Sequence, residues 1–181
     1  HINLAYAYGG LDQLKYEIKN LIGYSVDRYV KIDMDGFVKV INYIGGVEFD
    51  VPQNMYYTDE SQNLHINIKA GLQTLNGEQA LKLCRYRSYP GADITRIEVR
   101  SDFLKAAAEQ VLSSKFVSKA AELAGTMFDN VTTDMSLDDM VWFAKKAVTV
   151  KASDISFYTM PGGPANDSGM WIPYHDALLE M

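Results

Sequence analysis

Long apolar runs, paired cysteines and a basic charge balance are all missing from this sequence of 181 residues. The longest apolar runs are short, such as Met140 to Ala144, whereas a membrane span needs roughly 18 residues. The single cysteine, Cys84, excludes an internal disulfide, and its place after Ala80, Leu81 and Leu83 indicates a core residue. A formal net charge of -6 argues against a domain that mainly grips nucleic acid.

Zinc-ligand spacing, an initiator methionine and a signal peptide are also missing. The chain has three histidines and opens on His1, with neither a basic segment nor an apolar segment behind it. We therefore expect the true N-terminus to lie upstream.

Hydrophobic spacing predicts a soluble α/β protein that forms a single domain over residues 1–181. Apolar residues recur at helical spacing from Leu11 to Ile22, and Gly23 follows as a stop. A short strand is expected over Tyr29 to Ile32, then a helix from Asp35 to Ile44. The alternation in Val47 to Val51 predicts a strand with one buried face.

Later elements are predicted by caps and turn residues. Asn76 with Gln79, Thr95 with Glu98, and Ser136 with Asp139 each resemble a capping box. The other expectations are a polar surface excursion over 53–63, a strand near Ile66 and Ile68, a helix from Thr95 to about Leu112, a late strand at Ile155 to Tyr158, and a loop from Pro161 to Asp167.

Arginine placement is the most informative feature of the sequence. Of five arginines, Arg85, Arg87, Arg96 and Arg100 fall in one short window, while lysine supplies the other positive charges. Arginine binds phosphate or carboxylate oxygens through a planar fork. In an extended segment Arg85 and Arg87 share a side, and on a helix Arg96 and Arg100 share a face. The window therefore suggests an anion site.

Two questions remain open at this window. The arginines could instead form a solvated surface cluster, paired with Asp93, Glu98 and Asp102. If Thr95 is the cap, Arg96 stands at the positive end of the helix dipole, which favours an anion. Asp93 has three possible roles: capping the helix, which is the commonest, orienting an arginine, or contacting a metal.

The same window resembles a known family. Leu75-Asn76-Gly77-Glu78-Gln79-Ala80-Leu81, Arg85-Tyr86-Arg87, Asp93 and Arg96-Ile97 are similar to the LytR-CpsA-Psr domain. So, in the same order, are the opening Ile2 to Gly10, the stretch Asp27 to Ile32, Gly36-Phe37 through Ile44-Gly45-Gly46-Val47, and Met160-Pro161-Gly162 with Trp171 and Tyr174.

The resemblance implies a three-layer α/β/α sandwich around a mixed central sheet. It also implies a phosphotransferase that moves an anionic glycopolymer, such as teichoic acid or capsular polysaccharide, from a polyprenyl-pyrophosphate carrier to peptidoglycan. Catalytic Arg85, Arg87 and Arg96 would grip the pyrophosphate, with Asp93 and Arg100 completing the substrate-binding set. The resemblance also implies Mg2+ as cofactor, with its ligands upstream of this chain. It further implies an upstream anchor that holds the domain on the extracytoplasmic face of a bacterial membrane.

The sequence departs from the family pattern at three places. After Arg96-Ile97-Glu98 the family typically has Arg and then Gln, where this chain has Val99 and Arg100. The family's lysine before the Ile-Asn pair corresponds to His1, and its first segment is absent.

These departures favour an alternative function, a non-catalytic polyprenyl-phosphate-binding domain for maintenance of the cell envelope. A transcriptional regulator, a label that the family has often carried, is the weakest alternative, because the chain is acidic and has no recognition-helix pattern. The opening of the chain is rich in tyrosine. Tyr6, Tyr8 and Tyr16 could line a lipid pocket or, as is commoner for aromatics near helices, belong to the core.

Overall fold

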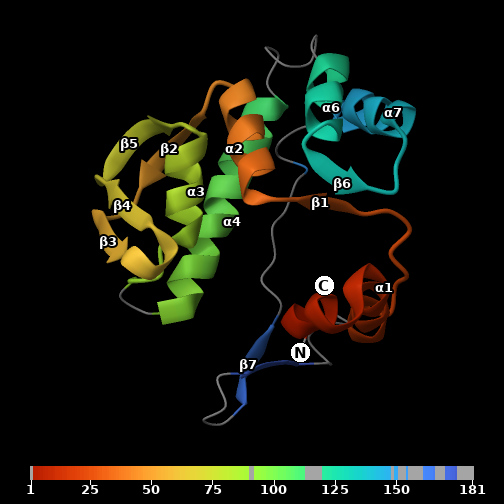
Figure 1. Ribbon diagram of the computed structural model, residues 1–181, viewed down its shortest axis with the longest axis horizontal. Helices are drawn as coiled ribbons and strands as arrows, with labels where there is room; N and C mark the ends of the chain where they lie inside the picture. Colours follow the sequence, from red (N-terminus) through yellow and green to blue (C-terminus); the bar gives the residue numbers. More distant parts are fainter. Residues whose placement is uncertain are drawn as a thin grey trace. The chain divides into compact units, whose positions relative to one another are not determined.

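The computed structural model describes residues 2–89, 92–112, 120–147, 149–150, 154, 161–165 and 170–174 (Figure 1). The chain divides into two compact units, His1–Tyr29 with Tyr158–Met181, and Val30–Phe157. The expected single domain over residues 1–181 stays a prediction.

The first unit contains a broken helix and a strand pair. Helix α1 (Ile2–Ile22) is interrupted at Gly10, whose φ of 65° and ψ of -152° are not helical. The predicted helix from Leu11 to Ile22 is therefore confirmed as its second part, and it ends where the N–H of Gly23 donates to the Lys19 carbonyl at 2.8 Å.

Strands β7 (Gly162–Ala165) and β8 (Met170–Pro173) pair antiparallel in this unit. The predicted loop from Pro161 is thus wrong over 162–165. A two-stranded ribbon tolerates Gly and Pro because both of its strands are edges. Gly163 also admits the Tyr174 hydroxyl at a place that a side chain would occupy. The predicted strand at 155–158 lies outside the described residues.

The second unit begins with β1 (Val30–Ile32) and α2 (Met34–Tyr43) and continues through two strand pairs. Strand β2 (Val47–Val51) pairs with β5 (Gly71–Leu75), and β3 (Met55–Asp59) pairs with β4 (Leu64–Ile68). The remaining elements are η1 (Glu60–Gln62), α3 (Gly77–Arg85), α4 (Ala92–Val111), α6 (Ala120–Phe128), β6 (Val131–Thr133), which pairs with β1, and α7 (Leu137–Ala147).

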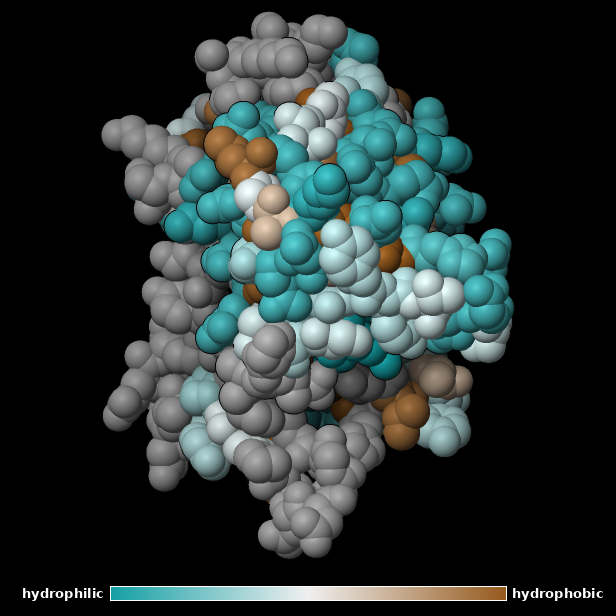
Figure 2. Space-filling view, turned by 90° about the vertical axis from the view of Figure 1, so that its left-hand side faces the viewer, coloured by the Kyte–Doolittle hydropathy of each residue, from teal (hydrophilic) through white to brown (hydrophobic). Residues whose placement is uncertain are grey.

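The core of this unit lies between the strand pairs and helices α2, α3 and α4. Strands β2 and β4 alternate buried and exposed residues, as hydrophobic alternation requires. The side of the molecule on which Figure 1 shows the strand pairs is mainly hydrophilic where it is coloured, with small apolar patches (Figure 2). The buried members are Ile41, Ile44, Val47, Phe49, Val51, Met55, Leu64, Ile66, Ile68, Leu75, Ala80, Leu83, Tyr86, Tyr89, Val99 and Phe103.

The expected polar excursion over 53–63 is wrong for its central part. Residues 55–59 form strand β3, which is held by the completely buried Met55 and by pairing with β4. The mixed α/β class is confirmed. The described strands form four antiparallel pairs, so the three-layer sandwich around a mixed central sheet stays a prediction. In the part of the chain that the structure describes, no helix combines the length and apolar character of a membrane span.

Candidate anion-binding site

Helix α3 places Arg85 because its start is fixed on α2. Asn76 and Gln79 form the predicted capping box, each side chain bonded to the other's backbone N–H. The Gly77 N–H donates to Asn42 Oδ1 at 2.8 Å, and a Cβ at Gly77 would collide with the Val38 carbonyl. The helix runs from this close contact to its last residue, Arg85.

Arg100 converges on the same end of α3. Its Nε donates to the Cys84 carbonyl at 2.8 Å, which caps α3 with a cation where the helix dipole is negative. Two arginines from different helices therefore meet at the C-terminus of α3, where Figure 1 shows α3 beside α4. We call Arg85 and Arg100 the α3-end pair.

Arg96 lies one turn before Arg100 on α4, and its Nε is buried. The helix begins at Ala92, so the prediction that Thr95 caps it is wrong. In sequence terms Pro90-Gly91 is the stronger break, and the helix starts directly after it. Arg96 is consequently inside the helix, beyond the free amides of its first turn, and not at the first helical position as expected.

Arg85 and Arg87 do not share one extended segment. Arg85 ends a helix and is half-buried, Tyr86 caps that helix with an extended backbone, and Arg87 is exposed. The expected common side of a strand is therefore wrong, because helical residues continue through position 85. Arg87 follows Arg85 of the α3-end pair by two residues.

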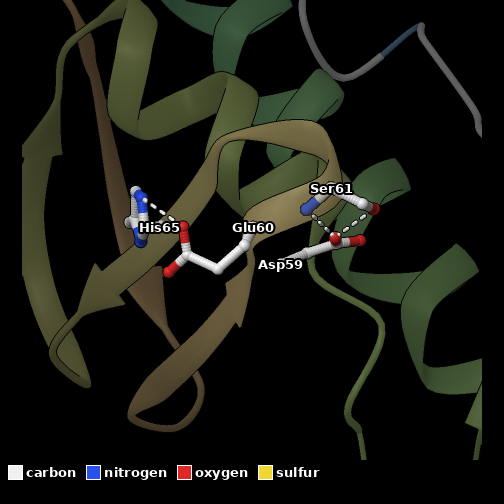
Figure 3. Close-up of polar contacts among 4 residues, drawn as sticks. All are labelled: Asp59, Glu60, Ser61 and His65. Atoms are coloured by element: carbon white, nitrogen blue, oxygen red, sulfur yellow. Dashed lines mark hydrogen bonds and ion pairs between the residues drawn. The ribbon is translucent and has the colours of Figure 1, made fainter.

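A glutamine that the sequence did not single out contacts Arg85. The guanidinium Nη2 donates to Gln62 Oε1 at 3.0 Å, and Gln62 Nε2 donates to Asp59 Oδ2 at 2.7 Å. Asp59 also accepts from the Ser61 N–H at 3.0 Å and from its hydroxyl at 2.5 Å (Figure 3). These hydrogen bonds, that from the Ser61 side chain first, hold the pKa of Asp59 below its usual value.

Two buried groups lie beside the α3-end pair. Burial raises the pKa of the Cys84 thiol, and the Arg100 charge opposes that shift. Burial also raises the pKa of Tyr89 to about 12, reinforced by Tyr86 and Cys84 and opposed by Arg100. The Tyr89 hydroxyl donates to Met55 Sδ at 3.9 Å. Cys84 is thus partly buried against the core, as predicted, and suited to packing rather than redox chemistry.

The acidic partners suggested by the sequence contribute little to what the structure describes. Glu98 and Asp102 are exposed, and among the described residues no ion pair joins either of them to Arg85, Arg87 or Arg100. The side chain of Asp93 lies outside the described residues, so its three possible roles stay open. Among described side chains, no three of the His, Cys, Asp and Glu type gather as a metal site would require.

Val99 and the tyrosines of the first helix, which the sequence also singles out, lie away from the α3-end pair in the sequence or face the core. Val99 is 6% exposed and belongs to the core, so it contributes packing there. Tyr6, Tyr8 and Tyr16 are all exposed, which contradicts the core interpretation. Tyr8 lines a pocket of about 280 Å³ in the first unit, together with Leu4, Ala5, Gly9, Gln13 and Glu17. His1 lies outside the described residues.

A second hollow, of about 300 Å³, lies at the start of α2. Its charged residues are of both signs, so it has no evident preference for an anion, and the arginine window remains the better candidate. The charged residues are Lys31, Asp33, Asp35, Lys39 and Asp129.

Fold and geometry together define an α/β protein with a candidate anion site at one helix end. The chain belongs to the LytR_cpsA_psr family, whose model matches residues 1–181. It is 32% identical over 140 residues to the polyisoprenyl-teichoic acid--peptidoglycan teichoic acid transferase TagV of Bacillus subtilis, covering 76% of this chain and 36% of that protein. It is 33% identical over 140 residues to the corresponding transferase TagU of Enterococcus faecalis, covering 77% of this chain and 44% of that protein.

Solved structures agree with the family assignment. The crystal structure of B. subtilis TagV superposes with a TM-score of 0.80 at 26% identity, covering 99% of this chain and 70% of that chain. The chain spans less than half the length of both curated relatives.

Proposed function

We propose that this chain is part of a cell-wall glycopolymer phosphotransferase, which moves an anionic glycopolymer from a polyprenyl-pyrophosphate carrier to peptidoglycan. The observation that carries the proposal is the convergence of Arg85 and Arg100 on the C-terminus of α3, in a chain that belongs to this family. The names of TagV and TagU support the substrate class. We also propose that the complete domain is a three-layer α/β/α sandwich around a mixed central sheet.

The chemistry needs positive charge next to a pyrophosphate. An acceptor hydroxyl of peptidoglycan forms a P–O bond with the phosphate next to the glycopolymer and loses its proton to solvent or a base. The P–O–P bridge breaks, and polyprenyl phosphate leaves with the bridging oxygen. Negative charge grows on that leaving group, and guanidinium groups held in place beforehand stabilise it.

Each arginine has a proposed part in this step. Arg85 binds the pyrophosphate through the N–H groups that Gln62 does not use, and Arg100 adds charge while its Nε is held on Cys84. Arg87 and Arg96 complete the grip, and Asp93 belongs to the same polar cluster.

Magnesium is part of the proposal, although the described residues do not form a carboxylate site for it. When bound, it would supply further charge neutralisation. We place its ligands outside this chain, together with the anchor that holds the domain at the extracytoplasmic face of the membrane.

The test is lipid analysis of the native full-length protein. Mass spectrometry of extracted lipid should find a polyprenyl phosphate or pyrophosphate in the wild type, and Arg85→Ala should lose it. Arg85→Lys should retain only part, because lysine keeps the charge but not the fork. Arg28→Ala is the matched control, since Arg28 is exposed and outside the window. No bound lipid, and none acquired from added polyprenyl phosphate, would remove the transferase assignment.

A non-catalytic polyprenyl-phosphate-binding domain is a second candidate. Val99 favours it, because the family resemblance expects a cation where this chain has a buried apolar residue. Tight lipid binding without transfer to peptidoglycan in the presence of magnesium would support binding alone, whereas magnesium-dependent transfer that fails in Arg85→Ala would establish the enzyme.

A further inference from the structure

The loop between β3 and β4 carries a chain of hydrogen bonds that ends on Arg85. It runs from the Asp59 carboxylate to the Gln62 amide and from there to the guanidinium. The loop is closed by the pairing of Asp59 with Leu64, which is 5% exposed, and the far end of β3 is held by the completely buried Met55. Asn63 then ends η1 in the left-handed conformation, with φ of 47°. The amide is therefore presented from a firmly held loop.

Asp59 decides which way the Gln62 amide faces. A carboxylate can only accept hydrogen bonds, so the NH2 group must turn to Asp59 and the carbonyl oxygen must turn to Arg85. Asp59 is itself oriented by two hydrogen bonds from Ser61. Rotating the amide by half a turn would place NH2 against guanidinium and carbonyl against carboxylate, which is unfavourable on both sides.

The neutrality of Gln62 matters as much as its orientation. The Gln62 oxygen engages one N–H group of Arg85 at 3.0 Å and leaves the positive charge uncompensated. Among the described residues, no carboxylate forms an ion pair with Arg85. A carboxylate at position 62 could still accept from the guanidinium, but it would repel Asp59 and would compete with an anionic ligand for Arg85.

We propose that Gln62, oriented by Asp59, is a positioning residue that aims Arg85 at its anion without neutralising it. This inference rests on the proposed function of Arg85 as a pyrophosphate ligand. Arg85 touches the substrate, whereas Gln62 and Asp59 act through Arg85.

The experiment measures binding of geranyl pyrophosphate, a short soluble polyprenyl pyrophosphate, to the native full-length protein by calorimetry. Gln62→Ala should weaken binding about fivefold, the effect of losing one hydrogen bond. Gln62→Glu should weaken it more than Gln62→Ala, with both variants fully folded at the assay temperature in a melting curve. A residue that only supports the fold would change binding only through the folded fraction, so a loss in Gln62→Glu no larger than that in Gln62→Ala would overturn the proposal.

A double-mutant cycle tests the role of Asp59. Asp59→Ala should weaken binding, and the pair with Gln62→Ala should lose no more than Gln62→Ala alone, because both act through one contact. Additive losses of binding free energy would show that Asp59 does not act through Gln62 and would overturn its proposed role in orienting the Gln62 amide.

Two control variants separate local charge from position. Glu60→Gln changes a carboxylate in the same loop. Glu60 points toward His65, with Oε2 4.0 Å from His65 Nε2, whereas Asp59 faces Ser61 (Figure 3). Gln53→Glu adds the same charge as Gln62→Glu outside this loop. Both should bind like the wild type. A loss equal to that of Gln62→Glu in Gln53→Glu would indicate a general charge effect, and the same loss in Glu60→Gln would indicate that any change in this loop weakens binding; either result would overturn the proposal.

Arg85→Ala distinguishes failure of this inference from failure of the proposed function. If Arg85→Ala binds like the wild type, the anion site is wrong, and the positioning role falls with it. If Arg85→Ala loses binding while Gln62→Ala and Gln62→Glu keep it, the anion site stands and the positioning role alone is refuted.

Discussion

Phe103 is the side chain whose removal should most weaken the helix that carries Arg96 and Arg100. It is 0% exposed on α4 and packs edge to face against Phe49 on β2, with ring centroids 5.6 Å apart. A second ring, Phe37 on α2, lies 6.5 Å away. Truncating a buried Phe to Ala typically costs about 3–5 kcal/mol. Aromatic pairs contribute about 0.5–1.5 kcal/mol each beyond their buried area. We therefore expect Phe103→Ala to lie in the upper half of that range.

Urea unfolding followed by circular dichroism measures this cost, and Leu104→Ala is the matched control. Leu104 is the next residue on the same helix and is 47% exposed, so its truncation should cost about 1 kcal/mol or less. Phe103→Leu should fall between the two variants. If Phe103→Ala unfolds at the same urea midpoint as Leu104→Ala, with an unchanged slope, the packing of α4 against β2 is refuted.

Two further predictions concern the base of the candidate site. Gly77→Ala should lower the free energy of unfolding by about 1–3 kcal/mol, because the added Cβ meets the Val38 carbonyl and forces α3 from α2; an unchanged urea midpoint would contradict that close contact. The pKa of Tyr89 is raised to about 12, so its hydroxyl stays protonated in the fold at a pH where a tyrosine of the unfolded chain, with a pKa near 10, already ionises. The free energy of unfolding should therefore fall as the pH rises from about 10 to 12. Urea midpoints at pH 9 and 11 check it: Tyr89→Phe should show a smaller alkaline loss than the wild type, and an equal loss would refute the shift.

Local signals in the sequence predicted those elements whose determinants lie within a few residues. The alternation of Val47, Phe49 and Val51 is the burial pattern of β2. The Ser136 and Asp139 capping box is formed as expected, with bonds of 3.0 and 3.1 Å. Both patterns are complete in one short segment, so they can be recognised without knowing which distant residues they contact.

Elements with a weak or ambiguous local signal are harder to predict. Strand β3 lies in a polar segment and has one buried residue followed by three exposed ones, so the sequence predicts a surface excursion there, although β3 pairs with the neighbouring strand β4. Thr95 and Glu98 have capping-box spacing, yet the helix begins earlier, at Ala92. Spacing alone cannot rank two competing start signals.

The candidate site shows the same division. The arginine window was visible in the sequence, because an unusual residue type is concentrated there. The bond from Arg100 to the Cys84 carbonyl and the contact of Gln62 with Arg85 arise only when separate segments meet in space. An exposed glutamine in a polar loop gives no signal of its own.

The nested order of the two central strand pairs has a consequence for the assembly of the chain. The β3–β4 hairpin lies entirely within the segment that joins β2 to β5. Once the inner hairpin closes, Val51 and Gly71, which are partners in the outer pair, are separated by short connections instead of a long loop. Less chain entropy is then lost when β2 meets β5. The loop that holds Gln62 is therefore the closing turn of the most local strand pairing in this part of the chain.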